Sequence, residues 1–374
     1  MKILVITTQD RFFLTHIQER ALFFKQKGWE VAIAAQMTDI KYQQQITSLG
    51  FKFYDTKLER SSINPLSQFF ALIRLKKIIK DFNPDISYHL GAKAIFYGTF
   101  VAKFSKKNIK VVNAPIGLGF VYASSSMKAR FLRPVVDLLY KFFLNPPNSK
   151  VIIENNDDIE YFIEAGSLNR SDAHCILGAG VDTEKFRPSK KHSGSIVVVM
   201  ASRLIVEKGV WDFVKMAETL FQEKLPVRCL LIGKPDEGNP SSISINDYER
   251  LKSNPSLECL GFCENVSKEF AQADICCFPT FYREGLPRVL IEAASSGLAI
   301  ITTDVIGCRE TVNGRNGLLV QTHDIQAMVE QIRYYVNNPD RLRIAQYESR
   351  ALALNKFDKR IICQQTYNVF KSLL

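Results

Sequence analysis

The chain has 374 residues, 46% of them apolar, and a formal net charge of +11 at pH 7. This length suits two domains of ordinary size, and the apolar content is sufficient for a hydrophobic core in each. The composition excludes a membrane-spanning helix, because no apolar run approaches the required length of about eighteen residues, and the short N-terminal run lacks the cleavage site of a signal peptide.

Positive charge is concentrated in the first part of the chain. Residues 1–150 contain 23 Lys and Arg against 9 Asp and Glu, whereas the remainder contains 26 against 29. A basic half favours a phosphorylated partner or an anionic membrane surface, although a merely solvated basic face gives the same count. Nucleic acid is disfavoured, because the stretches rich in basic and aromatic residues match no known nucleic-acid module.

The eight cysteines contain no Cys-x-x-Cys pair, and several fall in predicted strands. This spacing favours reduced, buried thiols in a cytosolic protein over a disulfide framework or a zinc site. We therefore expect no metal site in this chain.

The N-terminal elements follow a strand–helix–strand order. Residues 1–8 form the first predicted strand, a helix ends near Lys27 with Gly28 as its stop, and residues 29–35 form the second strand. The opening lacks a Gly-x-Gly-x-x-Gly sequence, so it does not support a dinucleotide site. His16 opens the helix, where a capping or partly buried histidine is as good an interpretation as a functional one.

Two further strand ends of the first half carry candidate residues. His89 and Lys93 lie at and beyond the end of the predicted strand 84–90, where they are placed to line a cleft or to serve the structure alone. The strand that begins at Val111 ends in a glycine loop, which lets the backbone approach a ligand closely or simply turn. The loop residues of interest are Gly117, Leu118 and Gly119.

Two helix starts are predicted before the domain junction. The segment 128–144 mixes cations with large apolar residues, and Pro134 is expected to split or to start a helix there. This segment suits a lipid interface, and it also suits a helix that packs on the core of the first domain. For the next helix, Asn156 or Asp157 is the predicted N-cap.

The polar stretch 189–195 is the predicted linker between the two domains. It is followed by the strand 196–200 and then by a loop that contains Arg203 and Lys208. Two cations at the end of a strand fit a diphosphate, because Arg binds phosphate bidentately and Lys acts as a point charge. The spacing by itself fits two surface cations as well.

The second half is organised around a strand–loop–helix–strand unit between residues 274 and 304. Pro287 and Gly297 mark the start and the end of its helix, because Pro suits the first helical turn and Gly a left-handed cap. Glu284 lies in the loop, and Glu292 lies roughly 8 Å along the helix axis. The free helix N–H groups between them favour a phosphate, so the unit suits a sugar nucleotide. Taken alone, the two glutamates also fit a surface loop and an ordinary helix.

Together these segments resemble the retaining glycosyltransferases of family 4. The block from Glu284 to Glu292 resembles the family's Glu-x7-Glu motif, and Arg203 to Gly209 resembles its Arg-Leu-x-x-x-Lys-Gly diphosphate motif. The segment 178–188 resembles the sequence at the family's domain junction, and the glycine loop resembles a signature of its capsule-type branch. The likeness covers most of the chain and is nearest to CapM-like and PglA-like enzymes. The glycine-rich turn that many members carry after the first strand is missing here.

The resemblance implies an α/β protein with the GT-B fold, in which two Rossmann-like domains have parallel sheets that face each other across a cleft. The acceptor-binding N-terminal domain would span residues 1–188, and the nucleotide-sugar-binding domain would span residues 195–354. The last helix, about 355–374, would cross back onto the first domain.

The same resemblance assigns roles to individual residues. Arg203 and Lys208 would neutralise the leaving diphosphate, Glu284 would bind hydroxyls of the transferred sugar and Glu292 the ribose. His16 would contact the reacting sugar or the acceptor. The donor site would also include Gly285, Leu286, Pro287, Arg288, Val289, Phe262 and Cys263. The residues expected on the acceptor side of the cleft are Gly117, Leu118, Gly119, His89 and Lys93.

The implied reaction is the retaining transfer of a hexose or N-acetylhexosamine from a nucleotide sugar, UDP-linked by preference. The acceptor would be a lipid-linked glycan in capsule, O-antigen or protein-glycan assembly, and no metal or cofactor would be needed. The expected location is the cytoplasm, with peripheral docking on the anionic inner face of the cell membrane and no nucleic-acid partner. Two alternatives stay open: a GT-B-fold nucleotide-sugar epimerase, a class that lacks the glutamate block, and a non-catalytic glycan-assembly protein, which the intact Arg, Lys and Glu set disfavours.

Overall fold

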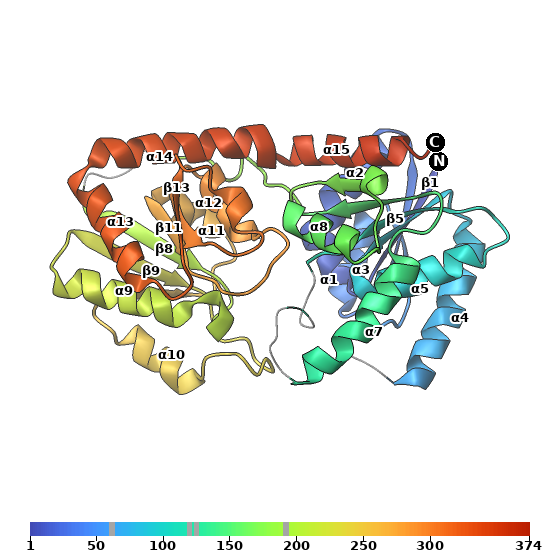
Figure 1. Cartoon of the computed structure of the whole chain (residues 1–374), viewed down its shortest axis with the longest axis horizontal. Coiled ribbons are helices and arrows are strands. Elements are labelled where there is room, and N and C mark those ends of the chain that lie inside the picture. The colour runs from blue at the N-terminus through green and yellow to red at the C-terminus, as the bar shows by residue number, and fades with distance from the viewer. Residues whose placement is uncertain (60–63, 118–121, 123–126, 190–193) are drawn as a thin grey trace. The chain divides into compact units, whose positions relative to one another are not determined.

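The chain forms two compact α/β units in the computed structural model, which describes residues 1–59, 64–117, 122, 127–189 and 194–374 (Figure 1). Unit 1 comprises Met1–Ala179 and Ile362–Leu374, and unit 2 comprises Gly180–Ile361. Each unit contains one parallel sheet, which confirms the α/β class expected from the sequence. In these described parts of the chain, no helix combines the length and the apolar character needed to cross a bilayer.

The described part of unit 1 contains a parallel sheet of seven strands in the order β3-β2-β1-β4-β5-β6-β7. The strands are Lys2–Thr7 (β1), Glu30–Ala35 (β2), Lys52–Asp55 (β3), Ile86–Leu90 (β4), Lys110–Ala114 (β5), Ser149–Ile153 (β6) and Ala173–Cys175 (β7). The register places Ile3 opposite both Val31 and Ile86. The chain order reverses between β1 and β4, which is the kind of point where open α/β sheets bind ligands.

Helices cover both faces of this sheet, because successive strand residues point to opposite faces and both faces are apolar. Ile3 and Val5 pack in one core cluster with the helices α2 (Gln18–Gln26) and α15 (Lys359–Lys371). Leu4 and Ile6 pack in another with α4 (Pro65–Phe82) and α5 (Ala92–Lys103). The described helices of unit 1 are Asp10–Phe12 (α1), Phe13–Ile17 (η1), Gln18–Gln26 (α2), Ile40–Ser48 (α3), Pro65–Phe82 (α4), Ala92–Lys103 (α5), Met127–Phe143 (α7), Asn156–Glu164 (α8), Arg170–Asp172 (η2) and, from Ile362 on, Lys359–Lys371 (α15).

The first helical region ends where the sequence predicts, before Gly28, whose φ is +80°. It also contains a feature that was not predicted: residues 13–17 form a π-helical turn, which carries His16. Such turns insert one extra residue into a helix and are frequent at functional sites.

Two helix predictions were wrong. The helix α7 continues through Pro134 instead of starting or splitting there, at the loss of the one backbone hydrogen bond that proline cannot donate. The N-cap of α8 is Asn155, because its Oδ1 accepts a hydrogen bond of 2.8 Å from the N–H of Asp158. The predicted caps, Asn156 and Asp157, lie in the first turn of that helix.

In unit 2, the described residues form a six-stranded parallel sheet in the order β10-β9-β8-β11-β12-β13, which reverses between β8 and β11. The strands are Ile196–Ala201 (β8), Val227–Ile232 (β9), Glu258–Gly261 (β10), Ile275–Phe278 (β11), Ala299–Thr303 (β12) and Gly317–Val320 (β13). The helices are Val206–Lys208 (η3), Val210–Gln222 (α9), Ile245–Lys252 (α10), Val266–Gln272 (α11), Arg288–Ser295 (α12), Arg309–Thr311 (η4), Ile325–Asn337 (α13), Pro339–Leu352 (α14) and Ala353–Phe357 (η5). Pro287 caps α12, and Gly297 follows it with φ +73°, as predicted.

The segment after Ala179 packs on unit 2. The N–H of Val181 donates to the carbonyl of Phe357 at 2.8 Å, and the N–H of Lys359 donates to the carbonyl of Val181 at 2.9 Å. The guanidinium of Arg350 donates to the carbonyl of Phe186, also at 2.9 Å. These contacts explain why unit 2 begins at Gly180, earlier than the end at residue 188 expected for the first domain. Of the expected linker, residues 190–193 lie outside the described residues.

The helix α15 returns the chain to unit 1 and buries an aromatic side chain there. Phe370 lies 4.7 Å from the ring of Phe24 and 5.1 Å, edge to face, from that of Tyr88. Contacts of this kind contribute beyond the apolar area that they bury. The C-terminal residues therefore belong to the core of unit 1.

The eight cysteines form no disulfide bond with one another, and five of them are buried. The expectation of burial was wrong for Cys175, which is exposed, and for Cys259 and Cys263, which are partly buried. Cys175 and Cys259 lie on β7 and β10, the outermost strands of their sheets, which are covered less completely than central strands.

Candidate functional site

A pocket of about 170 Å³ opens at the carboxyl ends of β8 and β11 in unit 2. This is the point where the strand order reverses, and there the loops after two adjacent strands diverge and leave a crevice. We call it the unit 2 pocket. Its lining consists of Ala201, Ser202, Arg203, Lys208, Phe278, Glu284, Pro287, Arg288 and Val289.

The central contact of the unit 2 pocket is an ion pair between Lys208 Nζ and Glu284 Oε1. Both side chains are mostly buried, with 11% of Lys208 and 19% of Glu284 exposed. The ammonium also lies 5.3 Å from the ring of Phe278 and 5.5 Å from that of Tyr282. Attraction between a cation and aromatic faces adds to that of the carboxylate. The structure therefore brings these two predicted residues together in one arrangement.

The loop of Glu284 is held by close approaches of backbone. Gly307 has φ +87°, and a Cβ there would lie 2.5 Å from the carbonyl oxygen of Gly285. Gly209, which ends the Lys208 turn, has φ +78°, and a Cβ there would lie 2.0 Å from the carbonyl oxygen of Pro279. Only glycine fits either position. Sequence reasoning did not select these glycines as packing residues, because the close approach depends on residues distant in the sequence.

Arg203 lines the pocket but extends into solvent, with 61% of its side chain exposed. Its Nη1 donates a hydrogen bond of 2.6 Å to Asp236, which also accepts one of 2.9 Å from Asn239. The hydrogen bond from Asn239 and the charge of Arg203 hold the pKa of Asp236 below its usual range. Asp236 was not predicted, because it follows β9 and only the fold brings it next to Arg203.

The N-terminus of α12 borders the same pocket. Its first residues, Arg288 and Val289, line the pocket, and the N-terminus of a helix favours anions because the positive end of the helix dipole lies there. Arg288 Nη2 donates to Glu292 Oε1 at 2.9 Å. Burial raises the pKa of Glu292, and the Arg288 charge offsets part of that rise. Glu292 is thus placed one turn into the helix, behind the pocket lining.

The other predicted donor residues lie apart from the pocket lining. Gly285 and Leu286 continue the loop, and the Leu286 side chain is buried. Phe262 and Cys263 follow β10 at the edge of the sheet. The ring of Phe262 is exposed, with Lys234 Nζ 5.9 Å from its centroid. Burial raises the pKa of the Cys263 thiol.

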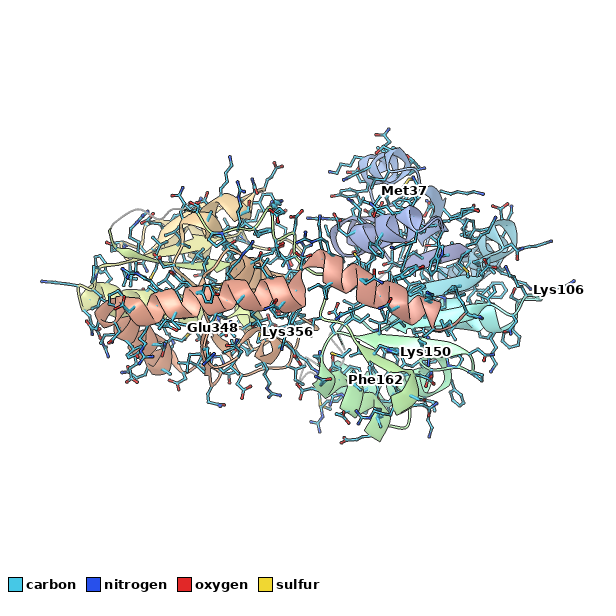
Figure 2. All side chains as sticks on the ribbon, turned by 90° about the horizontal axis from the view of Figure 1, so that it is seen from above. Met37, Lys106, Lys150, Phe162, Glu348 and Lys356 are labelled. Atoms are coloured by element: carbon cyan, nitrogen blue, oxygen red, sulfur yellow. The ribbon has the colours of Figure 1, made fainter. Side chains whose placement is uncertain are left out.

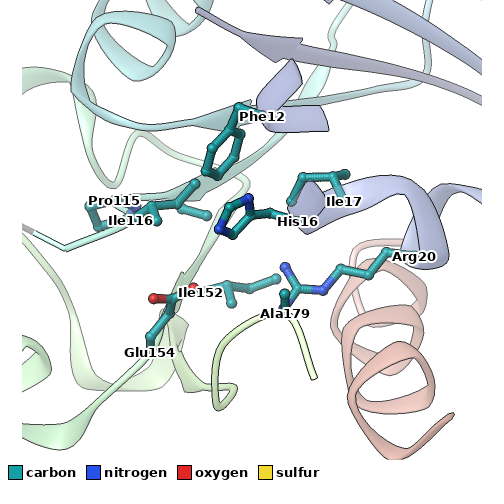
Figure 3. A pocket seen from close by; sticks show the side chains of 10 residues that line it. Phe12, His16, Ile17, Arg20, Pro115, Ile116, Ile152, Glu154 and Ala179 are labelled. Atoms are coloured by element: carbon teal, nitrogen blue, oxygen red, sulfur yellow. The ribbon is translucent and has the colours of Figure 1, made fainter. Parts of the chain in front are cut away.

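In unit 1, His16 lies over a narrow hollow that Phe12, Arg20 and Glu154 also line (Figure 3). The ring of His16 stacks on Phe12 at 4.3 Å, and its Nδ1 lies 2.7 Å from Thr15 Oγ1. The hollow has a volume of about 10 Å³, which is close to the space for one water molecule.

Arg20 also lines this hollow, and the sequence analysis did not select it. Its guanidinium is buried, donates to the hydroxyl of Tyr88 at 3.2 Å, and also donates to the carbonyl of Gly178. The signal was present in the sequence, because His16 and Arg20 are four residues apart and therefore share a helix face.

The structure corrects the expected position of His89. This ring is fully buried, with Nε2 2.6 Å from Ser87 Oγ and Nδ1 2.8 Å from Asn113 Oδ1. Burial lowers the pKa of His89 to about 4, so the ring is neutral. His89 is therefore a core residue, because it lies on β4, the central strand of the sheet, and α5 covers its ring at Gly98.

The remaining acceptor-side residues lie near the carboxyl edge of the unit 1 sheet. Lys93 is partly exposed, and its Nζ donates to the carbonyl of Glu59 at 2.7 Å. Gly117 has φ +60°, which is consistent with a tight turn after β5. Leu118 and Gly119 lie outside the described residues. Throughout the described ranges, no group of three or more His, Cys, Asp or Glu side chains is placed to hold a metal ion.

Both units match family models of glycosyltransferases. Residues 2–156 match the family model described as glycosyl transferase 4-like, and residues 195–338 match the model described as glycosyl transferases group 1. The chain is 27% identical over 348 residues to an N,N'-diacetylbacillosaminyl-diphospho-undecaprenol α-1,3-N-acetylgalactosaminyltransferase of Campylobacter jejuni, which covers 89% of each chain. It is 26% identical over 237 residues to the capsular polysaccharide biosynthesis glycosyltransferase CapM of Staphylococcus aureus, which covers 60% of this chain and 62% of that one.

Among solved structures, HepE of Anabaena in complex with UDP and glucose is similar over the full length of both chains, with a TM-score of 0.76 and 20% sequence identity. At this level of identity the likeness concerns the fold. It confirms the GT-B fold that the sequence predicts.

Proposed function

Because the chain belongs to the group 1 glycosyltransferases, we propose that it transfers a hexose or N-acetylhexosamine from a UDP-sugar to a lipid-linked saccharide, with retention of configuration. The observation that carries the proposal is the buried Lys208–Glu284 pair beside the N-terminus of α12. A cation, a carboxylate and a helix N-terminus at one crevice match the diphosphate and the hydroxyls of a sugar nucleotide.

In this proposal, the diphosphate of the donor occupies the unit 2 pocket. Lys208 and the N–H groups at the start of α12 bind its oxygens, and Arg203 exchanges its contact with Asp236 for one with phosphate. Glu284 accepts hydrogen bonds from hydroxyls of the transferred sugar, and Glu292 accepts one from the ribose. Positive groups already in place stabilise charge that develops on the leaving diphosphate, and such stabilisation is commonly the largest contribution to catalysis.

The chemical step breaks the bond between the anomeric carbon and the diphosphate oxygen. The acceptor hydroxyl adds to the same face of the oxocarbenium-like carbon, and its proton passes to the departing phosphate oxygen. The products are UDP and a glycoside with the configuration of the donor. No side chain acts as a covalent nucleophile in this scheme.

The acceptor proposal rests on the Campylobacter relative, whose name specifies an undecaprenyl-diphosphate saccharide as acceptor. Residues 1–150 carry 23 Lys and Arg against 9 Asp and Glu, which suits an anionic surface. The helix α7 exposes Phe131, Val135, Leu138 and Phe142 beside Arg130 and Lys141. We therefore place unit 1 on the cytoplasmic face of the cell membrane, with α7 at the lipid interface.

The test combines a panel of UDP- and GDP-sugars with an undecaprenyl-diphosphate-linked saccharide. We expect one UDP-sugar to release UDP and to extend the acceptor by one residue, with the donor's anomeric configuration in the NMR spectrum of the product. Release of an epimerised UDP-sugar in the absence of acceptor would instead identify an epimerase. An inverted product would overturn the proposed mechanism while leaving transfer intact.

Membrane docking has a separate test. Co-sedimentation with anionic vesicles is expected to decrease when Lys128, Arg130 and Arg133 are replaced by alanine. Equal and negligible binding by the wild type and this triple variant would remove the membrane from the proposal without affecting transfer.

A further inference from the structure

We propose that unit 1 binds a single anionic phospholipid in a groove between α4 and α5, with the phosphate at one end and an acyl chain along the helices. The inference rests on the proposed function only in that both place unit 1 at a membrane. The groove encloses about 770 Å³. We call it the α4–α5 groove and define it by Phe69, Ile73, Lys76, Lys80, Phe104 and Lys106.

The size of the α4–α5 groove suits a hydrocarbon chain. Its volume is within the range of about 300–1,000 Å³ that is usual for small-molecule sites. Its α4 wall runs from Phe69 to Asn83, which corresponds to roughly 20 Å along the helix axis. This length is comparable with the hydrocarbon depth of one leaflet, which is about half of the roughly 30 Å bilayer core.

The apolar walls of the groove are exposed to an unusual degree. Phe69, Ile73 and Phe104 are 58%, 51% and 66% exposed. Contiguous apolar surface of this kind marks an interaction site in a folded protein. Phe100 joins this wall to the next helix, because its ring contacts Phe104 at 4.9 Å and Phe143 of α7 at 6.3 Å. The helices α4, α5 and α7 are neighbours in this order within unit 1 (Figure 1), so these rings link the groove wall to α7.

Cations surround the groove without matching acids. Residues 64–110 contain nine Lys and Arg against two Asp. Both aspartates are already paired: Asp81 with Lys52 at 2.9 Å, and Asp85 with Lys107 at 2.7 Å. Across the part of the chain that the structure describes, no ion pair or hydrogen bond occupies the side chains of Lys76, Lys80 or Lys106, and Lys106 projects from the surface (Figure 2).

Charge and apolar surface occupy different ends of α4. Phe69 and Ile73 come first along the helix, and Lys76 and Lys80 follow. Lys106, which comes just after the end of α5, lines the same groove. A ligand with a hydrocarbon tail and an anionic head matches this order. A second copy of the chain does not, because a symmetric contact would bring the same excess of lysines from both copies into one interface.

The test uses monomeric dihexanoyl phosphatidylglycerol below its critical micelle concentration, titrated into the full chain by calorimetry. We expect saturable binding that weakens at least tenfold in the triple variant Lys76→Glu, Lys80→Glu, Lys106→Glu, and also in the double variant Phe69→Ser, Ile73→Ser. Glycerol 3-phosphate, which lacks the chains, and dihexanoyl phosphatidylcholine, which lacks the net charge, are expected to bind at least tenfold more weakly.

The matched control is Lys215→Glu, Lys268→Glu, Lys356→Glu, which changes the net charge equally at exposed positions of unit 2. It should bind the lipid as the wild type does. The glutamine version of the groove triple serves if the glutamate version fails to fold.

Equal binding of the lipid by the wild type and the groove triple, or no saturable binding, overturns the inference. Dimerisation that both groove variants abolish assigns the groove to a second copy and also overturns it. Failure of the proposed function is distinguishable, because it appears as absent transfer with every nucleotide sugar while the lipid titration still saturates.

Discussion

Lys208 and Glu284, which are 76 residues apart in the sequence, form an ion pair that joins the loops after β8 and β11. The pair lies where the strand order of the unit 2 sheet reverses, so its position follows from the topology of the fold. Because each residue compensates the charge of the other in a mostly buried setting, removal of either one affects both stability and chemistry.

Replacement of Lys208 by alanine or of Glu284 by glutamine should abolish most transfer while the fold persists. We expect kcat to fall by about 10²–10³, as for the loss of one preorganised group that stabilises transition-state charge. Transfer assays measure kcat, and near-UV circular dichroism shows whether the fold persists. The matched control is Arg228→Ala, which breaks an exposed pair with Glu258 in the same unit. Near-wild-type turnover by the Lys208 and Glu284 variants would refute the assignment.

Substitution of Gly307 by alanine should weaken donor binding. The backbone φ of +87° is strained for alanine, and the alanine Cβ would approach the carbonyl oxygen of Gly285 too closely. The Glu284 loop would therefore have to move. We expect KM for the UDP-sugar to rise at least tenfold. Gly314→Ala is the control, because Gly314 also has positive φ, at +79°, but its Cβ would meet no atom within 4 Å. Equal effects of the two substitutions would indicate backbone strain alone.

The buried carboxyl of Glu292 should make stability depend on pH. Its pKa is raised above the ordinary value of 4.5 by burial, so the folded state binds the proton more tightly than the unfolded state. The associated stabilisation is complete below 4.5 and is lost as the pH rises through the folded-state pKa. Urea unfolding across this window should therefore show the wild type losing stability relative to Glu292→Gln as the pH rises.

The control for this pH effect has the opposite sign. The hydrogen bond from Arg228 lowers the pKa of Glu258 below 4.5, so its stabilisation is present above that value and is lost as the pH falls through the folded-state pKa. The difference in the free energy of unfolding between Glu258→Gln and the wild type should thus become smaller at low pH. A gap between Glu292→Gln and the wild type that stays constant with pH would contradict the account of Glu292.

His16 should affect transfer without affecting donor affinity. It belongs to unit 1, whereas the proposed donor site belongs to unit 2. For His16→Gln we expect kcat to fall by about 10²-fold, the lower range for a positioned polar group, and the Kd of UDP to stay unchanged in calorimetry. His174→Gln, a half-buried histidine of the same unit, is the control. Loss of UDP binding in His16→Gln would contradict the proposed division of roles.

Transfer should persist in excess EDTA. In the proposed site, Arg203, Lys208 and the helix N–H groups supply the positive charge that a divalent ion supplies in other phosphate sites. We expect less than a twofold change in initial rate after extensive chelation and dialysis. A large loss that Mg²⁺ or Mn²⁺ restores would show that these groups are insufficient.

The pattern of residues was sufficient for the class of fold and for several residues that the structure brings together in or beside the unit 2 pocket. Short apolar runs alternating with amphipathic segments predicted the parallel sheets, and Pro287 and Gly297 marked the limits of α12, because these effects act within a few residues. Arg203, Lys208, Glu284 and Glu292 could also be selected from the sequence, because the spacing of residues within a motif is a local property.

Contacts between distant segments were decided only by the tertiary structure. The sequence places His89 at the end of a strand, but the folded sheet buries it under Gly98, so that its role is in the core. Likewise, Asp236 reaches Arg203 because β8 and β9 are neighbours in the sheet. Local patterns report which face of an element is apolar, whereas burial and pairing depend on which other element covers that face, and this is settled only when the whole chain packs.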